Sequence, residues 1–251
     1  MSVYDIRSIS QVGTVEPFEL QVARGQIPGH SQINIFGYQP LVGTTAICIW
    51  EQAVPYVYPS AAVFMTLVST SASDGSAMSI IVRGLAADYS YQQEVVTMNG
   101  TTPVNTTKAF LRINNLIITT TSATSIVNAG TITASNGGVV YGQINPGIGQ
   151  SQMAQYSVPL GHSFYLTRVN SFAQQNGGNN NYNTYSVEAT NPNVTYSVLQ
   201  SPYFQSYEAI RVIPFRYAEK TSVQWRSRTQ SNTSSVGMVI EGILVKEKGP
   251  I

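Results

Sequence analysis

The stretch MSIIVRGLAADYSYQQEVVTMNG, residues 78–100, carries the pattern that decides the fold. Two runs rich in Val, Ile and Tyr, 78–85 and 89–98, are separated by Ala86-Ala87-Asp88, and Asn99-Gly100 follows the second run. β-branched and aromatic residues favour strands, and Asn-Gly tolerates the positive φ that a hairpin turn needs. The stretch therefore predicts two strands of an antiparallel sheet, each bounded by a tight turn.

The same pattern recurs on both sides of this stretch. Turn-forming segments such as 73–76 and 135–138 separate nearly all of the runs, while helix formers such as Lys, Glu and Leu are scarce and no helical stripe occurs. Strand, turn and strand at spacings of about ten residues are typical of antiparallel β-sandwiches and jelly rolls. The further runs are 63–68, 109–119, 131–134, 139–144, 155–158, 164–172, 185–189, 195–199, 210–217, 221–228 and 237–245.

About thirteen strands exceed what one sandwich of seven to nine strands needs, so we expect two packed β-modules. The turn-rich segment 146–150 is the natural place to divide them. Residues 16–23 read as one strand, but Gly and Pro interrupt the segments 25–29 and 37–40. We therefore expect an extended N-terminal arm at 1–45, which lies on a neighbour or on its own sandwich, and β-sandwich modules at 46–148 and 149–251.

The composition indicates a folded chain with little net charge. Its 251 residues include 43% hydrophobic and 10% charged residues, and 13 Lys and Arg against 12 Asp and Glu give a net charge of +1. Such a chain can bury a substantial core, but it lacks the excess of basic residues by which nucleic-acid binders gather phosphates. We expect no direct nucleic-acid binding. Neither a secretion signal nor 18 consecutive uncharged apolar residues is visible, so we also expect no membrane contact.

Residues that could carry chemistry are few. Cys48 lies in the alternating segment 46–50, which predicts a small buried hydrophobe rather than a reactive thiol. His30 and His162 each follow Gly in a turn, which favours a structural role. Asp74 and Asp88 each offer a single acid where a calcium loop needs several.

The twelve acidic residues are spread singly along the chain, so no carboxylate pair of the kind that glycosidases use is visible. We expect no catalytic residue, no cofactor and no metal site. A depolymerising enzyme remains a minor alternative, and the acids to test for it are Glu94, Glu188 and Glu208.

Two features suit recognition as well as folding. The polar stretch 174–183 reads as a hairpin tip in solvent, and it could instead be a contact tip, since amide- and tyrosine-rich loops suit adaptable surfaces. The 15 Tyr and 8 Phe could fill sandwich cores or form contact patches for proteins or sugars.

The segment VEPFELQVARGQIPGH, residues 15–30, together with 35–45 and Trp50, resembles virion structural proteins of tailed bacteriophages, especially marine and cyanobacterial ones. The likeness continues in five further segments and covers nearly the whole chain. These motifs are turns and strand starts, so they indicate a shared scaffold. The five segments are 56–62, 99–104, 128–132, 156–161 and 236–245.

The resemblance implies a β-rich, capsid-decorating or tail-associated protein that is present in many copies in the virion and is assembled in the host cytoplasm. Its expected partners are major capsid or tail proteins and further copies of itself, held by symmetric apolar contacts. The alternative is a receptor- or glycan-binding module of a tail fibre, whose partner would be a host surface glycan.

Overall fold

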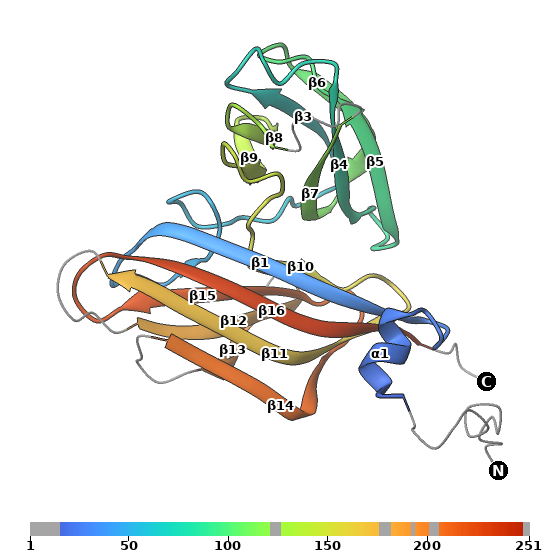
Figure 1. Ribbon diagram of the computed structural model, residues 1–251, viewed down its shortest axis with the longest axis vertical. Coiled ribbons are helices and arrows are strands. Elements are labelled where there is room, and N and C mark those ends of the chain that lie inside the picture. The colour runs from blue at the N-terminus through green and yellow to red at the C-terminus, as the bar shows by residue number, and fades with distance from the viewer. Residues whose placement is uncertain (1–15, 121–126, 176–181, 192–193, 201–205, 248–251) are drawn as a thin grey trace.

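The computed structural model describes residues 16–120, 127–175, 182–191, 194–200 and 206–247. Within these ranges the chain forms sixteen strands and one short helix, and all of the strand pairs are antiparallel. The predicted all-β class is therefore confirmed. The strands form two modules that lie one above the other (Figure 1).

The base module, in the lower part of Figure 1, has two sheets. The first has the order β1 (His30–Val42), β16 (Ser234–Lys246), β11 (His162–Gln175) and β14 (Ser206–Tyr217). The second has the order β10 (Gln155–Ser157), β15 (Ser222–Thr229), β12 (Tyr182–Asn191) and β13 (Val194–Gln200), and β2 (Ile47–Cys48) also pairs with β15.

The insert module, in the upper part of Figure 1, is built from one continuous stretch of chain between β2 and β10. One sheet has the order β6 (Val104–Phe110), β3 (Val63–Ser69), β8 (Ile132–Asn136) and β9 (Val139–Ile144). The other has the order β5 (Tyr91–Thr97), β4 (Met78–Leu85) and β7 (Arg112–Thr120).

Each module has its own apolar core between its two sheets. In the base module, Phe164 of the first sheet and Trp225 of the second belong to one buried cluster. In the insert module, Leu67 and Ile80 of the two sheets belong to another. Because alternate residues of a strand point to one face, the period-two runs of the sequence supply these inward-facing side chains.

The division of the chain differs from the expected boundaries at residues 45 and 148. Residues 30–42, expected in an extended arm, form β1, which pairs with β16 in the base module. In the sequence, Gly37 and Pro40 suggest that a strand is interrupted. In the structure, Gly37 is required because a Cβ there would collide with Ala154. Pro40 is tolerated because it lies on an edge strand, where the register shifts. The base module therefore combines both ends of the described chain.

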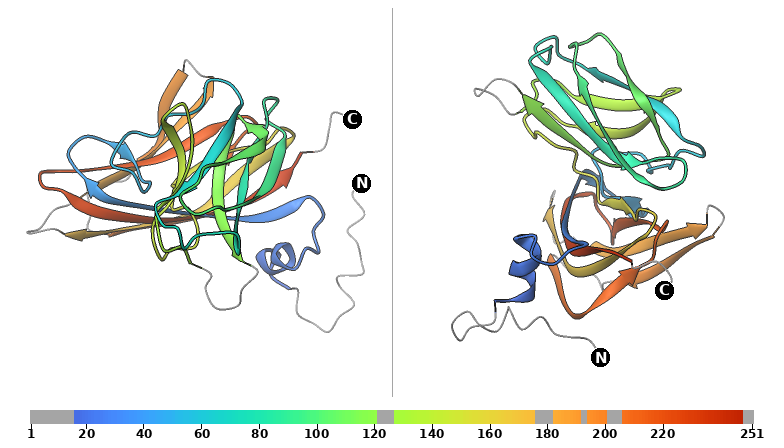
Figure 2. Two further views of the ribbon diagram at one scale, coloured as in Figure 1. Left: turned by 90° about the horizontal axis from the view of Figure 1, so that it is seen from above. Right: turned by 90° about the vertical axis from the view of Figure 1, so that its right-hand side faces the viewer.

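Residues 16–23 do not form the expected strand; Phe18–Ala23 form the helix α1. The carbonyl of Pro17 accepts hydrogen bonds from the N–H groups of Leu20 and Gln21, which closes the first helical turn. The alternation of Phe18, Leu20 and Val22 suggested a strand, but only Val22 is buried. The helix lies beside the base module (Figure 2), and no helix of the described chain is long and apolar enough to cross a membrane.

Candidate interaction sites

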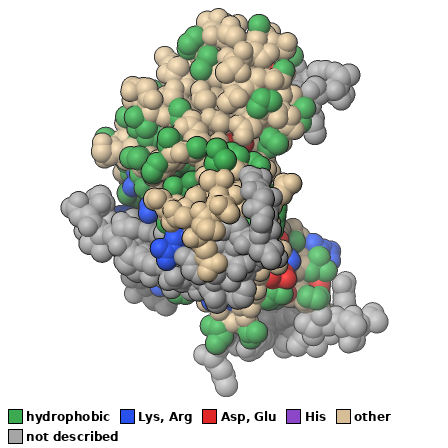
Figure 3. Space-filling model, turned by 90° about the vertical axis from the view of Figure 1, so that its left-hand side faces the viewer, with side chains coloured by type: hydrophobic (Ala, Val, Ile, Leu, Met, Phe, Trp, Pro, Cys, Tyr) green, Lys and Arg blue, Asp and Glu red, His purple; other side chains and the backbone are tan. Residues whose placement is uncertain are grey.

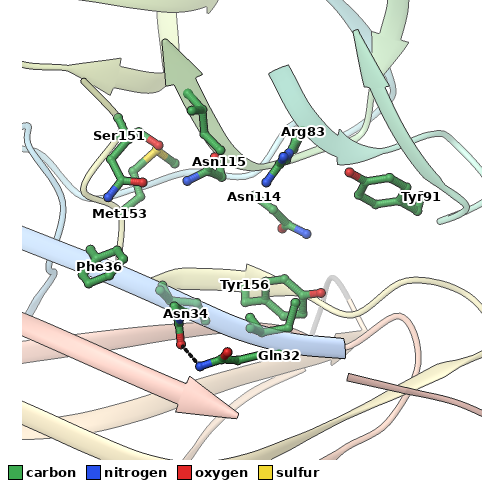
Figure 4. A pocket seen from close by; sticks show the side chains of 14 residues that line it. Gln32, Asn34, Phe36, Arg83, Tyr91, Asn114, Asn115, Ser151, Met153 and Tyr156 are labelled. Carbon is green, nitrogen blue, oxygen red and sulfur yellow. Dashed lines mark hydrogen bonds between the residues drawn. The ribbon is translucent and has the colours of Figure 1, made fainter. Parts of the chain in front are cut away.

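A cleft of about 340 Å³ separates the two modules (Figure 4). Its lower wall is residues 32–36 of β1, and its upper wall comes from β4, β5 and β7 of the insert module. Its lining residues include neither carboxyl, imidazole nor thiol groups, so the cleft offers hydrogen bonds, rings and one positive charge. The lining residues include Gln32, Asn34, Phe36, Arg83, Asn114 and Asn115.

The module junction next to the cleft is held by a buried arginine. Nε of Arg112 donates to Ser222 Oγ over 3.0 Å, and Nη1 donates to the carbonyl of Pro59 over 3.1 Å. The guanidinium carbon lies 4.6 Å from the centre of the Tyr58 ring and 5.5 Å from that of Tyr89. Because the planar guanidinium can bond in its plane and stack on rings, Arg112 ties β7 to the base module through neutral partners.

Glu51 is a second buried polar group near the junction. It follows β2, and its Oε1 accepts a hydrogen bond from the N–H of Asn145 over 3.1 Å. Burial raises the pKa of the Glu51 carboxyl to about 7, although backbone N–H groups of Asn145 and Gln152 oppose the rise. The carboxyl therefore changes its charge near neutral pH.

The edge strand β14 carries an apolar ridge. The register between β11 and β14 shifts between Leu166 and Arg168, so residues 211–214 form a bulge. Edge strands with exposed apolar side chains are sites at which other chains pair or pack. The exposed fractions are 73% for Ile210, 98% for Val212 and 85% for Ile213.

An apolar groove of about 650 Å³ runs between this ridge and α1. Phe18 and Leu20 of the helix line one side, and Ile210 and Val212 line the other. Phe18 and Leu20 are each nearly half exposed, and the charged residues Glu19, Arg168, Arg211 and Glu241 also line the groove. We call the ridge and the groove together the β14 surface.

Charged side chains are sparse on the described surface. The face shown in Figure 3 is mostly uncharged, and Lys, Arg, Asp and Glu lie mainly on its lower half. Near the β14 surface, Arg168 pairs with Glu208 over 2.6 Å and with Glu241 over 3.4 Å. Contacts through this region would therefore depend mainly on apolar burial, with a rim of exposed ion pairs.

Two of the three candidate acids, Glu94 and Glu208, lie in different modules. Glu94 lies in the insert module, where its carboxylate accepts hydrogen bonds from the N–H groups of Thr107 and Lys108. Glu208 lies in the base module and pairs with Arg168. The backbone of Glu188 belongs to β12, and its side chain lies outside the described part of the structure.

The two histidines and Asp74 have local bonding partners. Nδ1 of His30 lies 3.1 Å from the carbonyl of Pro28, and Nδ1 of His162 lies 2.9 Å from that of Leu160. Asp74 is buried and accepts hydrogen bonds from Ser69 Oγ and from the N–H groups of residues 129 and 130. The described residues contain no cluster of three His, Cys, Asp or Glu side chains that could hold a metal ion.

Cys48 and the tyrosines can now be placed. Cys48 is buried, as predicted, and burial raises the pKa of its thiol to about 12. Tyr56, Tyr156 and Tyr217 are buried, whereas Tyr91 is exposed at the cleft. The predicted contact tip is 174–183, and its residues 176–181 lie outside the described residues.

Sequence reasoning missed both the cleft and the groove. The cleft is formed by segments 32–36 and 114–117, which are far apart in the chain, and the groove needs the unexpected helix α1. The run 210–217 was visible as a strand, but the exposure of Ile210, Val212 and Ile213 depends on β14 being at an edge.

Comparisons with known proteins give little to add to this geometry. The sequence matches no protein-family model and no curated protein. Among solved structures, a chain from "Structure of infectious bursal disease virus Gt strain" is similar to this chain, with 9% sequence identity over 92% of this chain and 78% of that chain. The TM-score is 0.24, a weak likeness on which nothing below depends.

Proposed function

We propose that the chain is a non-enzymatic structural protein of a bacteriophage virion, which assembles in many copies on the capsid or the tail and reinforces it through symmetric protein–protein contacts. The observation that carries the proposal is the β14 surface. Val212 and Ile213 are almost fully exposed and Ile210 is largely exposed on an edge strand, next to a groove that Phe18 and Leu20 also line. An edge strand that exposes large apolar side chains is a site at which other chains pair or pack, and assembly would bury these side chains.

The composition and the sequence resemblance support the same role. A net charge of +1 with 10% charged residues gives little long-range repulsion between copies. Residues 15–30 and the segments downstream resemble virion proteins of tailed bacteriophages, and this resemblance is why we propose a phage particle.

The test is self-association of the purified chain. In sedimentation-velocity experiments, the wild type is expected to form a defined oligomer that persists in 1 M NaCl, because burial of apolar surface is screened little by salt. The Val212→Ser, Ile213→Asp variant should sediment as a monomer with an unchanged unfolding transition. Val95→Asp, which changes an exposed residue of β5 in the insert module, is the matched control and should assemble normally.

A second measurement tests whether the chain is part of the mature virion. Antibody labelling of mature virions should detect the chain in many symmetric positions on the head or the tail. A wild-type chain that stays monomeric at high concentration, or that is absent from mature particles, would contradict the proposal.

A further inference from the structure

The strand β1 has an unpaired edge that faces the cleft between the modules. Among the strands that the structure describes, it is the outermost of its sheet and pairs only with β16. On the edge that faces β16, the carbonyl of Gly29 accepts a hydrogen bond from the N–H of Lys246. On the opposite edge of β1, the N–H of Tyr38 donates to the carbonyl of Gln152. In an antiparallel strand these directions alternate with each residue, so odd-numbered residues bond to β16 and even-numbered residues point outward.

The outward-pointing residues on the cleft wall are Gln32, Asn34 and Phe36. Between residues 32 and 36 the described chain supplies no main-chain partner on this side, since the segment that bonds to β1 begins at Tyr38. The N–H and C=O groups of these three residues therefore form a row of donors and acceptors open to the cleft. A row of this kind is a template for one further strand.

The opposite wall adds two groups suited to a peptide. Asn115 lines the cleft, and its Oδ1 is buried with no hydrogen-bond partner in the described chain. The side chain of Arg83 extends into the cleft, and no acidic residue of the described chain pairs with it (Figure 4). Arg83 is also the only charged residue that lines the cleft.

We propose that the cleft binds an extended peptide segment that bears an acidic side chain, and that the segment adds as a strand to the outer edge of β1. Its main chain bonds to Gln32, Asn34 and Phe36, and its carboxylate bonds to Arg83. The unpaired strand edge favours a polypeptide over a sugar, because it offers donors and acceptors at the spacing of another strand. Gln32 lines both this cleft and the groove of the β14 surface, whereas Asn34, Phe36 and Arg83 line the cleft and not the groove. The inference goes beyond the proposed function.

Fluorescence anisotropy of a labelled peptide with the full chain tests the site. The probe is the acetylated, amidated peptide VTDTV, and its matched controls are VTNTV and a VTDTV that is N-methylated at alternate residues. Wild type should bind VTDTV saturably and bind the N-methylated peptide at least tenfold more weakly. Arg83→Gln should weaken VTDTV severalfold without changing VTNTV, and Arg216→Gln, outside the cleft, should change neither.

Substitutions of Asn34 distinguish the contribution of its main-chain N–H to peptide binding from that of its side chain. Its N–H points outward, so Asn34→Pro removes one cleft-facing donor without breaking a bond to β16, and Pro is compatible with an edge strand. Asn34→Pro should keep the wild-type unfolding transition and lose at least tenfold in affinity, whereas Asn34→Ala should bind within twofold of wild type.

Three results would overturn the proposal. One is equal binding of the N-methylated and the unmodified peptide, a comparison that needs no variant to fold. Another is full affinity in a folded Asn34→Pro variant. The third is saturable binding of a neutral oligosaccharide such as chitotetraose with no binding of VTDTV, which would assign the cleft to a glycan instead.

Discussion

Asn114 of the insert module and Ser157 of the base module are joined by two reciprocal hydrogen bonds. Nδ2 of Asn114 donates to the carbonyl of Ser157, and the N–H of Ser157 donates to Oδ1 of Asn114, each over 2.9 Å. The side-chain amide thus takes the place of a neighbouring strand for β10. Nε2 of the adjacent Gln155 donates to the carbonyl of Ile113, so β10 and β7 are fixed to each other at two positions.

Asn114→Ala should lower the free energy of unfolding by about 2–3 kcal/mol. The substitution removes both bonds and leaves the main-chain groups of Ser157 without these partners at a largely buried site. Urea unfolding followed by tryptophan fluorescence measures the effect. Asn34→Ala, which changes an exposed asparagine of β1, is the control, and a loss of equal size in both variants would contradict a specific role of Asn114.

Arg112→Lys should also destabilise the chain, by about 2 kcal/mol, although the charge is kept. Lysine cannot reproduce the in-plane bonds to Ser222 and Pro59 together with stacking on Tyr58. The measurement is the shift in thermal unfolding. Arg83→Lys at the open cleft should change little, and an Arg112→Lys variant as stable as wild type would refute this account of the junction.

The strands could be predicted from the sequence because their apolar residues alternate. Each of the thirteen predicted runs overlaps a strand of the structure. Alternation of apolar and polar residues places the apolar side chains on one face of a strand, as a half-buried sheet requires. β1 was missed because Gly37 and Pro40 are typical of a loop, and the need for glycine at position 37 depends on Ala154, more than 100 residues away. The cleft depends in the same way on the packing of segments distant in sequence, which local patterns do not encode.

Gly37→Ala should cost about 2–3 kcal/mol, because β1 passes close to the segment before β10. A Cβ at Gly37 would lie 2.8 Å from the carbonyl oxygen of Ile49 and closer still to the Cβ of Ala154, so the backbone would have to move. Gly43→Ala is the matched control, since nothing lies within 4 Å of a Cβ there. Unfolding curves of the two variants should differ clearly, and coincident curves would contradict the close approach.

Cys48 should be unreactive in the folded chain. The side chain is buried, its Sγ lies 3.7 Å from the carbonyl oxygen of Ala154, and its thiol has a raised pKa. Ellman's reagent at pH 8 should label no thiol in the native chain and one thiol per chain in 6 M guanidinium chloride. Complete labelling within minutes under native conditions would show that this part of the base module opens readily.

Glu51 should make stability depend on pH between about 4.5 and 7. The pKa of the carboxyl rises from 4.5 to about 7 on folding because the group is buried, so the folded state favours the protonated form. The contribution of Glu51 to the free energy of unfolding is fully present below pH 4.5, is lost as the pH rises through the folded-state pKa, and is absent above that pKa. The rise corresponds to a loss of up to about 3 kcal/mol by pH 8.

Glu51→Gln tests this sign, because the amide keeps the shape of the side chain and cannot ionise. The variant should unfold at a higher urea concentration than wild type at pH 8, and the difference between the two urea midpoints should decrease as the pH falls toward 5. Glu19→Gln, which changes an exposed acid of α1, should follow wild type at every pH. If Glu51→Gln and wild type instead lose stability in parallel from pH 5 to pH 8, a group other than the Glu51 carboxyl carries the pH dependence.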